Sequence, residues 1–265
     1  MDNTKELPIL LSLCSGYGGI ERGLELAGFK HRVIAHVEIE AFAIAHLVEK
    51  MEKGRLHPAP IWSNLKTLPL DCFRGRVDVL TGGYPCQPFS AAGQRKGKDD
   101  PRHLWPYIFD IIQAIRPIRC FFENVEGHVS LGLREVIEDL EILGYQTTWG
   151  IFSAGEVGAP HHRKRVFIMA DTSGKGLQRC GITRNISGKE SEPDDQFAPG
   201  CNSAQIGKWP PEPSVGRVVD GCADRVDRIR MLGNGVVPQT AALAWVTLEK
   251  QLEKAGRGNE PGRLE

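Results

Sequence analysis

The chain has 265 residues, 41% of them hydrophobic and 25% charged, so it can bury a sizeable core without a disulfide or metal staple. Its 33 basic residues balance 33 acidic ones, so the net charge does not point to a polyanionic partner. The seven cysteines form no Cys-x-x-Cys pair, which argues against a zinc site. No apolar run approaches the roughly 18 residues of a membrane helix. We therefore expect a cytoplasmic protein without a metal.

In chain order, apolar runs alternate with segments of helical spacing through the first 170 residues. The run 8–13 ends in the glycine-rich turn 15–19, and helical spacing then continues until Gly28. The other expected strands are 32–37, 77–81, 118–122, 145–152 and 165–170, and the other expected helices are 40–53, 104–115, 129–143 and 236–252. This alternation predicts an α/β fold with a doubly wound, mostly parallel sheet.

The segment 172–222 has a different character, rich in Gly, Ser, Asn and Pro with little periodicity. We expect it to be a small irregular insertion in a domain formed by residues 1–171 and 223–256, with a flexible tail at 257–265. Seven basic residues against one acid lie between His161 and Lys189, and they flank the same candidate site as the basic loop 95–98.

Cys86 is the most informative residue of the chain. It follows the strand 77–81 on a turn between Pro85 and Gln87. Ligands of open α/β sheets bind at the carboxyl ends of the strands, and a cysteine on such a turn is displayed rather than packed. These features make Cys86 a candidate nucleophile.

The turn 15–19 and Glu38 indicate a nucleoside cofactor. Glycines let the backbone approach a ligand at a helix amino terminus. Glu38 ends the second strand 22 residues after Gly16, a spacing at which a carboxylate meets a ribose diol. Alone, Glu38 could equally be a solvated acid at a strand end. An oxidoreductase that binds a dinucleotide would share both features, so they do not identify a reaction.

Glu123 follows the strand 118–122, at the sheet edge where Cys86 is expected. A carboxyl group beside a thiol suits proton delivery, although Glu123 or Asn124 could instead cap a helix. Arg163 and Arg165 lead into the next strand, and strand alternation sends both to one side. Their guanidinium groups could bind carbonyl or phosphate oxygens there.

These segments together resemble the DNA (cytosine-5)-methyltransferases. The motifs that carry the resemblance are 16–19, 85–87, 123–125, 163–165 and 232–237, in that order. The resemblance covers about residues 8–171 and 216–250, and the insertion falls where that family carries its target-recognition domain. Each motif alone is weak, but their conjunction in one order is specific.

The resemblance implies a Rossmann-like enzyme that moves a methyl group from S-adenosylmethionine to C5 of a flipped-out cytosine in double-stranded DNA. Cys86 would add to C6 of the base. Glu123 would bind N3 and the exocyclic amine, and Arg165, assisted by Arg163, would hold O2. The implied cofactor residues are Ser15, Gly16, Tyr17, Gly18, Gly19, Ile20, Glu38, Ile39, Asn64, Leu65, Gly83, Pro85, Asn234 and Val236. The implied substrate residues are Gln87, Ser90 and Asn124.

Four positions depart from the usual pattern of that family. Cys14 replaces a phenylalanine that stacks on the adenine, and Asn64 replaces an aspartate whose oxygen binds the adenine amino group. The amide oxygen of Asn64 can still accept that hydrogen bond. His161 and Gly235 replace a usual glutamine and serine.

Three other functions remain open at this point. A tRNA cytosine-5 methyltransferase uses nearly the same catalytic residues, and a catalytically silent DNA-binding relative would keep the fold. An oxidoreductase would give Cys86 and Glu123 no role. For the DNA enzyme, the implied partners are double-stranded DNA and a cognate restriction endonuclease. One flipped cytosine per event makes a monomer sufficient, and the short insertion predicts a very short recognition sequence or help from a partner.

Overall fold

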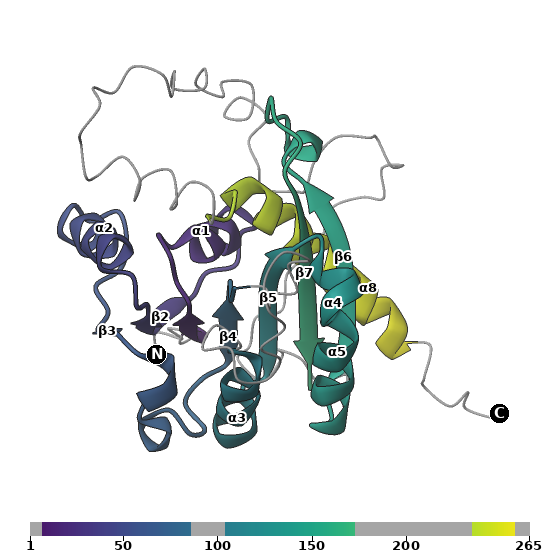
Figure 1. The fold of residues 1–265 in the computed structure, drawn as a ribbon, viewed down its shortest axis with the longest axis horizontal. Helices are drawn as coiled ribbons and strands as arrows, with labels where there is room; N and C mark the ends of the chain where they lie inside the picture. Colours follow the sequence, from purple (N-terminus) through teal and green to yellow (C-terminus); the bar gives the residue numbers. More distant parts are fainter. Residues whose placement is uncertain (1–6, 86–103, 173–234, 258–265) are drawn as a thin grey trace, which may run out of the picture.

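The computed structural model describes residues 7–85, 104–172 and 235–257. Its centre is a seven-stranded sheet in the order β3-β2-β1-β4-β5-β7-β6 (Figure 1). The strands are β1 (Ile9–Leu13), β2 (Arg32–Val37), β3 (Ile61–Trp62), β4 (Val79–Gly82), β5 (Arg119–Val125), β6 (Gln146–Ser153) and β7 (Lys164–Asp171). Neighbours from β3 to β5 are parallel, whereas β7 is antiparallel to β5 and β6. The predicted mostly parallel sheet is confirmed.

Helices cover both faces of the sheet, as expected for a doubly wound fold. The helices are α1 (Gly19–Leu26), α2 (Ala41–Glu52), α3 (Trp105–Ile115), α4 (His128–Leu131), α5 (Leu133–Ile142) and α8 (Pro238–Arg257), with short 3-10 turns η1 (Leu65–Thr67), η2 (Leu70–Cys72) and η4 (Gly155–Val157). Helices α1 and α8 contribute to one buried apolar cluster, and α3 and α5 contribute to the other. The sequence neighbours Phe121 and Phe122 lie in different clusters, so β5 is buried on both faces.

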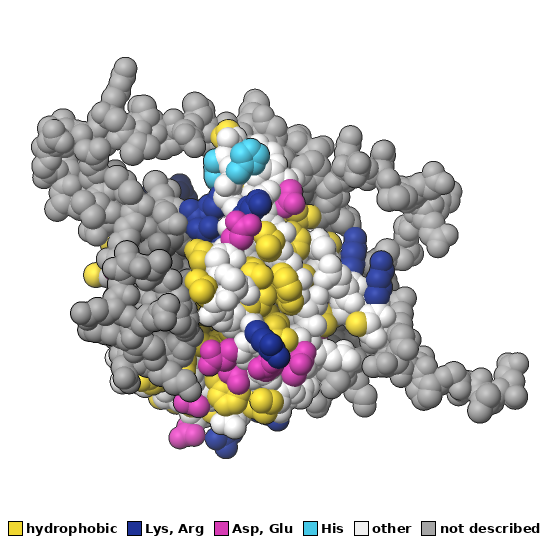
Figure 2. All heavy atoms as spheres, turned by 45° about the vertical axis from the view of Figure 1, so that its right-hand side comes forward, with side chains coloured by type: hydrophobic (Ala, Val, Ile, Leu, Met, Phe, Trp, Pro, Cys, Tyr) yellow, Lys and Arg dark blue, Asp and Glu magenta, His cyan; other side chains and the backbone are white. Residues whose placement is uncertain are grey.

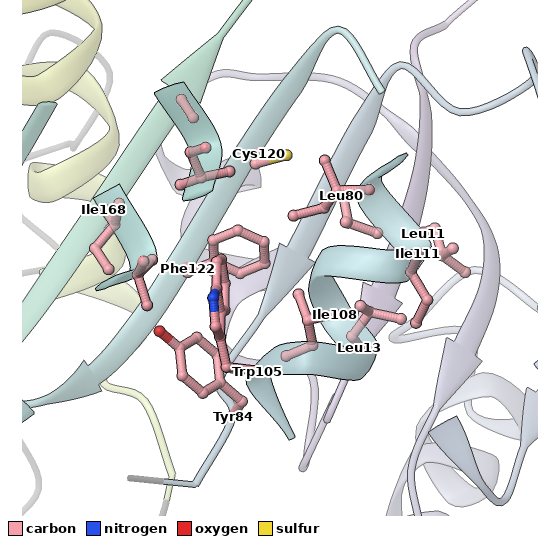
Figure 3. Packing of buried hydrophobic residues seen from close by; sticks show 14 of the residues in the cluster. Leu11, Leu13, Leu80, Tyr84, Trp105, Ile108, Ile111, Cys120, Phe122 and Ile168 are labelled. Atoms are coloured by element: carbon pink, nitrogen blue, oxygen red, sulfur yellow. The ribbon is translucent and has the colours of Figure 1, made fainter. Parts of the chain in front are cut away.

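On the face of the sheet that α3 covers, several aromatic side chains pack together next to the chain segment that leads to Cys86. Figure 3 shows the rings of Tyr84 and Trp105 beside the ring of Phe122. The hydroxyl group of Tyr84 lies 3.1 Å from Nε2 of the buried His128. These contacts fix the backbone just before Pro85 at the end of β4.

Three local expectations were wrong. The predicted strand 118–122 continues to Val125, because β7 pairs with it as far as the Val125–Arg165 register pair, so Glu123 lies within the strand. The predicted helix 129–143 is two helices that meet at Gly132, where a Cβ atom would lie 3.0 Å from the His128 ring. Helix α8 begins at Pro238 rather than Val236.

The insertion beyond Thr172 and the tail beyond Arg257 lie outside the described residues, as do Cys86, Gln87, Ser90 and Asn234. Within the described ranges, no helix is long and apolar enough to cross a membrane. The same ranges contain no group of three or more His, Cys, Asp or Glu side chains arranged to hold a metal ion.

Candidate active site

Glu123 and Gly83 bring the ends of β5 and β4 together. The two strands are parallel neighbours, with Gly82 opposite Phe122. A Cβ atom added at Gly83 would lie only 3.3 Å from Oε2 of Glu123. A glycine at position 83 therefore lets the chain that leads to Pro85 pass directly beside the carboxyl group. Cys86 follows Pro85 in the sequence, so its loop starts next to Glu123.

The carboxyl group of Glu123 is buried and paired with a cation. Its residue is 5% exposed, and Nε of Arg165 lies 2.8 Å from Oε1. This ion pair is close but poorly aligned, because Oε1 has no hydrogen bond of good geometry among the described residues. Burial raises the pKa of Glu123 to about 7, although Arg165 and Arg163 lower it. Near neutral pH the group can therefore hold or release a proton, as general acid catalysis requires.

The two arginines approach Glu123 from the start of β7. Arg165 is the register partner of Val125, and its Nη1 donates a hydrogen bond to the carbonyl oxygen of Lys164 at 2.8 Å. Arg163 precedes the strand, and its Nη2 donates to the carbonyl oxygen of Gly235. Burial and the neighbouring Arg165 lower the pKa of Arg163. The structure thus brings three predicted catalytic residues into one group, with the fourth, Cys86, outside the described residues.

The hairpin of β6 and β7 projects beyond the sheet at this end (Figure 1). The imidazole of His162 lies near Gly155 of η4, where an added Cβ atom would be 3.2 Å from Nδ1. Figure 2 shows histidine side chains beside both basic and acidic ones at one end of the molecule, above an area of apolar side chains. In this view the charges are mixed, in keeping with the balanced composition.

The turn between β1 and α1 offers open backbone to a ligand. Gly16 and Gly18 have φ angles of 53° and 77°, in the region that favours glycine. Among the described residues, and apart from its two chain neighbours, no heavy atom lies within 4 Å of a Cβ atom placed on Gly16. Helix α1 starts at Gly19 without a side-chain cap, so its first amide groups are available to an acceptor.

Glu38 ties the end of β2 to this turn. Its Oε2 accepts a hydrogen bond from the amide of Gly16 at 2.7 Å, and its Oε1 accepts one from the amide of Glu40 at 2.8 Å. The next residue, Ile39, is 70% exposed. A carboxylate that accepts hydrogen bonds, an open glycine turn and an exposed apolar side chain together fit a nucleoside cofactor.

Several residues expected at the cofactor use their side chains elsewhere. Ile20, Leu65 and Val236 are buried in the apolar core, so these positions offer mainly backbone to a ligand. Oδ1 of Asn64 accepts a hydrogen bond from the amide of Lys66 at 3.0 Å and thereby caps η1. Cys14 has a φ of 48° and packs against the core, where burial raises its pKa to about 12.

Asn124, expected at the substrate, is 1% exposed. Its Oδ1 accepts from the amide of Val125 at 2.8 Å, and its Nδ2 has no hydrogen-bond partner among the described residues. Asn124 follows Glu123 within β5, so strand alternation points its side chain to the face opposite Glu123. A role of this side chain at the substrate therefore stays a prediction.

A buried polar cluster beneath the glycine turn was missed in the sequence. It consists of Ser12, Ser15, Glu21, His36 and Thr81. Ser12 is the register partner of both His36 and Thr81, and the Ser12 and Ser15 hydroxyl groups are 2.7 Å apart. Thr81 donates to Glu21 at 2.8 Å, and Nδ1 of His36 lies 3.2 Å from the Ser15 hydroxyl. The only sequence signal is a polar residue inside each of three apolar strands.

Comparison with known proteins gives one family. The family model described as "C-5 cytosine-specific DNA methylase" matches residues 9–208. Type II methyltransferase M.NaeI of Lentzea aerocolonigenes is 32% identical over 166 residues, which are 61% of this chain and 39% of that protein. Type II methyltransferase M.NgoMIV of Neisseria gonorrhoeae is 34% identical over 168 residues, which are 60% of this chain and 50% of that protein.

A similar fold is found in solved structures. The S. pombe Dnmt2 methyltransferase superposes with a TM-score of 0.53 at 25% identity, over 68% of this chain and 57% of that one. The Entamoeba histolytica methyltransferase EhMeth superposes with a TM-score of 0.53 at 21% identity, over 64% and 54% of the two chains. The chain therefore spans half or less of the two curated relatives and little more than half of the solved ones.

Proposed function

Because the chain belongs to the C-5 cytosine-specific DNA methylases, we propose that it methylates C5 of a flipped-out cytosine in double-stranded DNA. The methyl donor is S-adenosylmethionine. The observation that carries the proposal is the position of Glu123, a buried carboxyl group between Gly83, at the start of the cysteine turn, and the guanidinium group of Arg165. Curated relatives that carry the name Type II methyltransferase support it.

C5 of cytosine is too weak a nucleophile to attack the methyl donor by itself. The enzyme must therefore supply a nucleophile of its own that activates the ring. The Cys86 thiolate forms a bond to C6, and the ring electrons then make C5 nucleophilic. When bound, S-adenosylmethionine would supply an electrophilic methyl group, which C5 takes as the S–CH3 bond breaks and the sulfur leaves as the neutral thioether of S-adenosylhomocysteine. After transfer, C5 loses its proton to a base, which we take to be water, and the bond between Cys86 and C6 breaks. The base must leave the duplex for this attack, at a cost of a few kcal/mol of unstacking.

Glu123 stabilises the adduct in this mechanism. In its protonated form, one oxygen donates to N3 of the base while the other accepts from the exocyclic amine. A pKa of about 7 keeps this form populated at neutral pH. Arg165 holds the carboxyl group in place and donates to O2, and Arg163 assists at the same site.

The cofactor lies in this proposal along the carboxyl ends of β1, β2 and β4. Glu38 binds the ribose hydroxyl groups, and the open backbone at Gly16 and Gly18 lets the ligand approach. The exposed side chain of Ile39 would offer an apolar contact to the adenine. Cys14 is half-buried and has no aromatic ring to stack on the adenine, so adenine binding would depend more on its other neighbours.

We further propose that the protein is the modification partner of a restriction endonuclease and acts as a monomer. The first part rests on the Type II names of its curated relatives. The second rests on the reaction, which needs one active site and one flipped cytosine. We expect the insertion 172–222 to contact the DNA bases.

The direct test is methyl transfer from labelled S-adenosylmethionine to mixed-sequence duplex DNA and, separately, to total tRNA. Label in DNA that is lost in Cys86→Ser, but kept in a Cys72→Ser control at an exposed cysteine, supports the proposal. Label in tRNA alone would overturn the DNA assignment. Label in neither substrate, with the cofactor bound, would overturn the proposal that this chain methylates DNA by itself and favour a missing partner or a DNA-binding role.

A further inference from the structure

Tyr17 lies in the cofactor turn, yet its side chain points to a segment far away in the sequence. Its hydroxyl group donates a hydrogen bond to the carbonyl oxygen of Val236 at 2.7 Å, across 219 positions of the chain. From the other side, Nζ of Lys50 donates to the carbonyl oxygen of Tyr17 at 2.7 Å and lies 5.2 Å from the ring centroid. Both ends of the residue are therefore held.

The ring of Tyr17 also fills the space beside Gly235. A Cβ atom at position 235 would overlap Cε1, Cζ and the hydroxyl oxygen of the ring. Close by, a Cβ atom at Gly19 would lie 2.8 Å from the carbonyl oxygen of Val236. The two backbones touch here because both positions are glycine, and Figure 1 shows the start of α8 beside α1. The tyrosine ring at position 17 therefore requires glycine, which has no side chain, at position 235.

The same short segment holds a catalytic arginine. The carbonyl oxygen of Gly235 accepts a hydrogen bond from Nη2 of Arg163, one residue before the carbonyl that Tyr17 binds. Arg163 in turn acts on the charge of Glu123, whose pKa it lowers. A continuous set of contacts therefore runs from the cofactor turn through residues 235–236 to the guanidinium group beside the catalytic carboxyl.

We propose that Tyr17 is a positioning residue for methyl transfer, which holds Gly235 and Val236 and through them fixes Arg163 beside Glu123. This inference rests on the proposed function, because Glu123 must act on the cytosine for the position of Arg163 to affect the rate. The cofactor turn itself is held by Glu38 and by the Ser15 contacts, so Tyr17 acts mainly on kcat.

The first test compares Tyr17→Phe with Tyr107→Phe, a control at a tyrosine that is 38% exposed on α3. Loss of the hydroxyl group removes one hydrogen bond, so we expect kcat to fall about fivefold, with affinity for S-adenosylmethionine changed by less than about twofold. The apparent pKa of Glu123 should also rise, because Arg163 is less firmly held. Equal kcat and equal pH profiles in the two variants would overturn the inference and leave only a packing role.

The second test enlarges the side chain at position 235 and shortens the one at position 17. Gly235→Ala should lower kcat strongly, because its methyl group collides with the Tyr17 ring. In a Tyr17→Val background the ring is gone, so the same alanine should cost little. The cycle of two single and one double variant, measured by kcat and by urea unfolding, should be clearly non-additive. Additive effects in both measurements would contradict the pairing.

These outcomes are separate from the failure of the proposed function. If the wild type labels DNA but Tyr17→Phe behaves like the control, only the positioning role is lost. If the wild type labels no nucleic acid, the proposed function fails, and the unfolding cycle still decides whether Tyr17 and Gly235 are matched.

Discussion

The strand pair β5 and β7 carries two buried groups of acids and arginines, one at each end, and they differ in how many hydrogen bonds join the arginine to its acids. At the start of β5, Nε and Nη2 of Arg119 both lie 2.8 Å from Oδ2 of Asp171, and Nη1 donates to Glu249 of α8 at 2.7 Å. At the other end, Nε of Arg165 lies 2.8 Å from Oε1 of Glu123, and no aligned hydrogen bond to that oxygen is found among the described residues.

We assign a stabilising role to the group around Arg119 and a catalytic role to the group around Glu123. Burial lowers the pKa of Arg119, but Asp171 and Glu249 outweigh it, so the guanidinium remains charged and joins α8 to the sheet. At Glu123 burial wins over two arginines and raises the pKa. Burial also raises the pKa of Asp171, so the raised pKa does not by itself distinguish the two groups. They differ in the partners of the arginine: Arg119 contacts two acids, whereas Arg165 contacts only Glu123 among the described acids.

Glu123→Gln should produce the largest effect. Glutamine keeps the shape but cannot deliver a proton to N3, so kcat should fall by about a hundredfold or more. The fold should remain intact, because the carboxyl group is not well satisfied in the native state. Methyl transfer measures the loss of kcat, and far-ultraviolet circular dichroism checks that the fold is intact. A variant with nearly wild-type kcat would remove Glu123 from the mechanism.

Asp171→Ala should do the opposite. It leaves the buried Arg119 with one partner fewer, and we expect a loss of about 3 kcal/mol in the free energy of unfolding. Residual activity per folded molecule should stay near wild type, because the change is at the far end of β5. Urea unfolding together with active-site titration checks this. A stable but inactive variant would show that the two ends are not independent.

Arg165→Lys should have a smaller effect on the rate. Lysine keeps the charge but not the planar fork that contacts Glu123, so we expect about a tenfold loss of kcat. Steady-state methyl transfer measures it, with Arg134→Lys as a control at an exposed arginine of α5. An unchanged kcat would mean that only the positive charge at position 165, and not the shape of the guanidinium group, contributes to catalysis.

The pH dependence should give the smallest but most specific signal. With a folded pKa of about 7, Glu123 binds its proton more tightly when folded, so its contribution favours folding at low pH and is lost as pH rises from about 4.5 to 7. At pH 8, Glu123→Gln should be more stable than wild type, by at most about 3 kcal/mol. The advantage should shrink toward pH 4.5. The alkaline limb of kcat/KM near pH 7 should be missing in this variant.

Sequence patterns predicted features that depend on neighbouring residues in the chain, such as the bounds of single strands. The strand Arg32–Val37 was predicted with its observed bounds, since polar or turn residues flank its apolar run. Glu123 and Asn124 looked like loop residues because they are polar, yet pairing with β7 keeps them in a strand.

Contacts between distant segments were not predictable. The match between Tyr17 and Gly235, and the shared register of Ser12, His36 and Thr81, depend on which strands and helices become neighbours. Glu123 and the arginines were identified from their motifs, but the alignment of the ion pair and the raised pKa of Glu123 follow from packing alone.

The central claim is that Cys86 attacks cytosine beside Glu123, and a covalent trap tests it most directly. The protein is incubated with S-adenosylmethionine and duplex DNA that contains 5-fluorocytosine, whose C5 position cannot release a proton. The account predicts an adduct that survives denaturant, maps to the peptide containing Cys86, and is absent in Cys86→Ser. An adduct at another residue, or methylated DNA without any adduct, would contradict it.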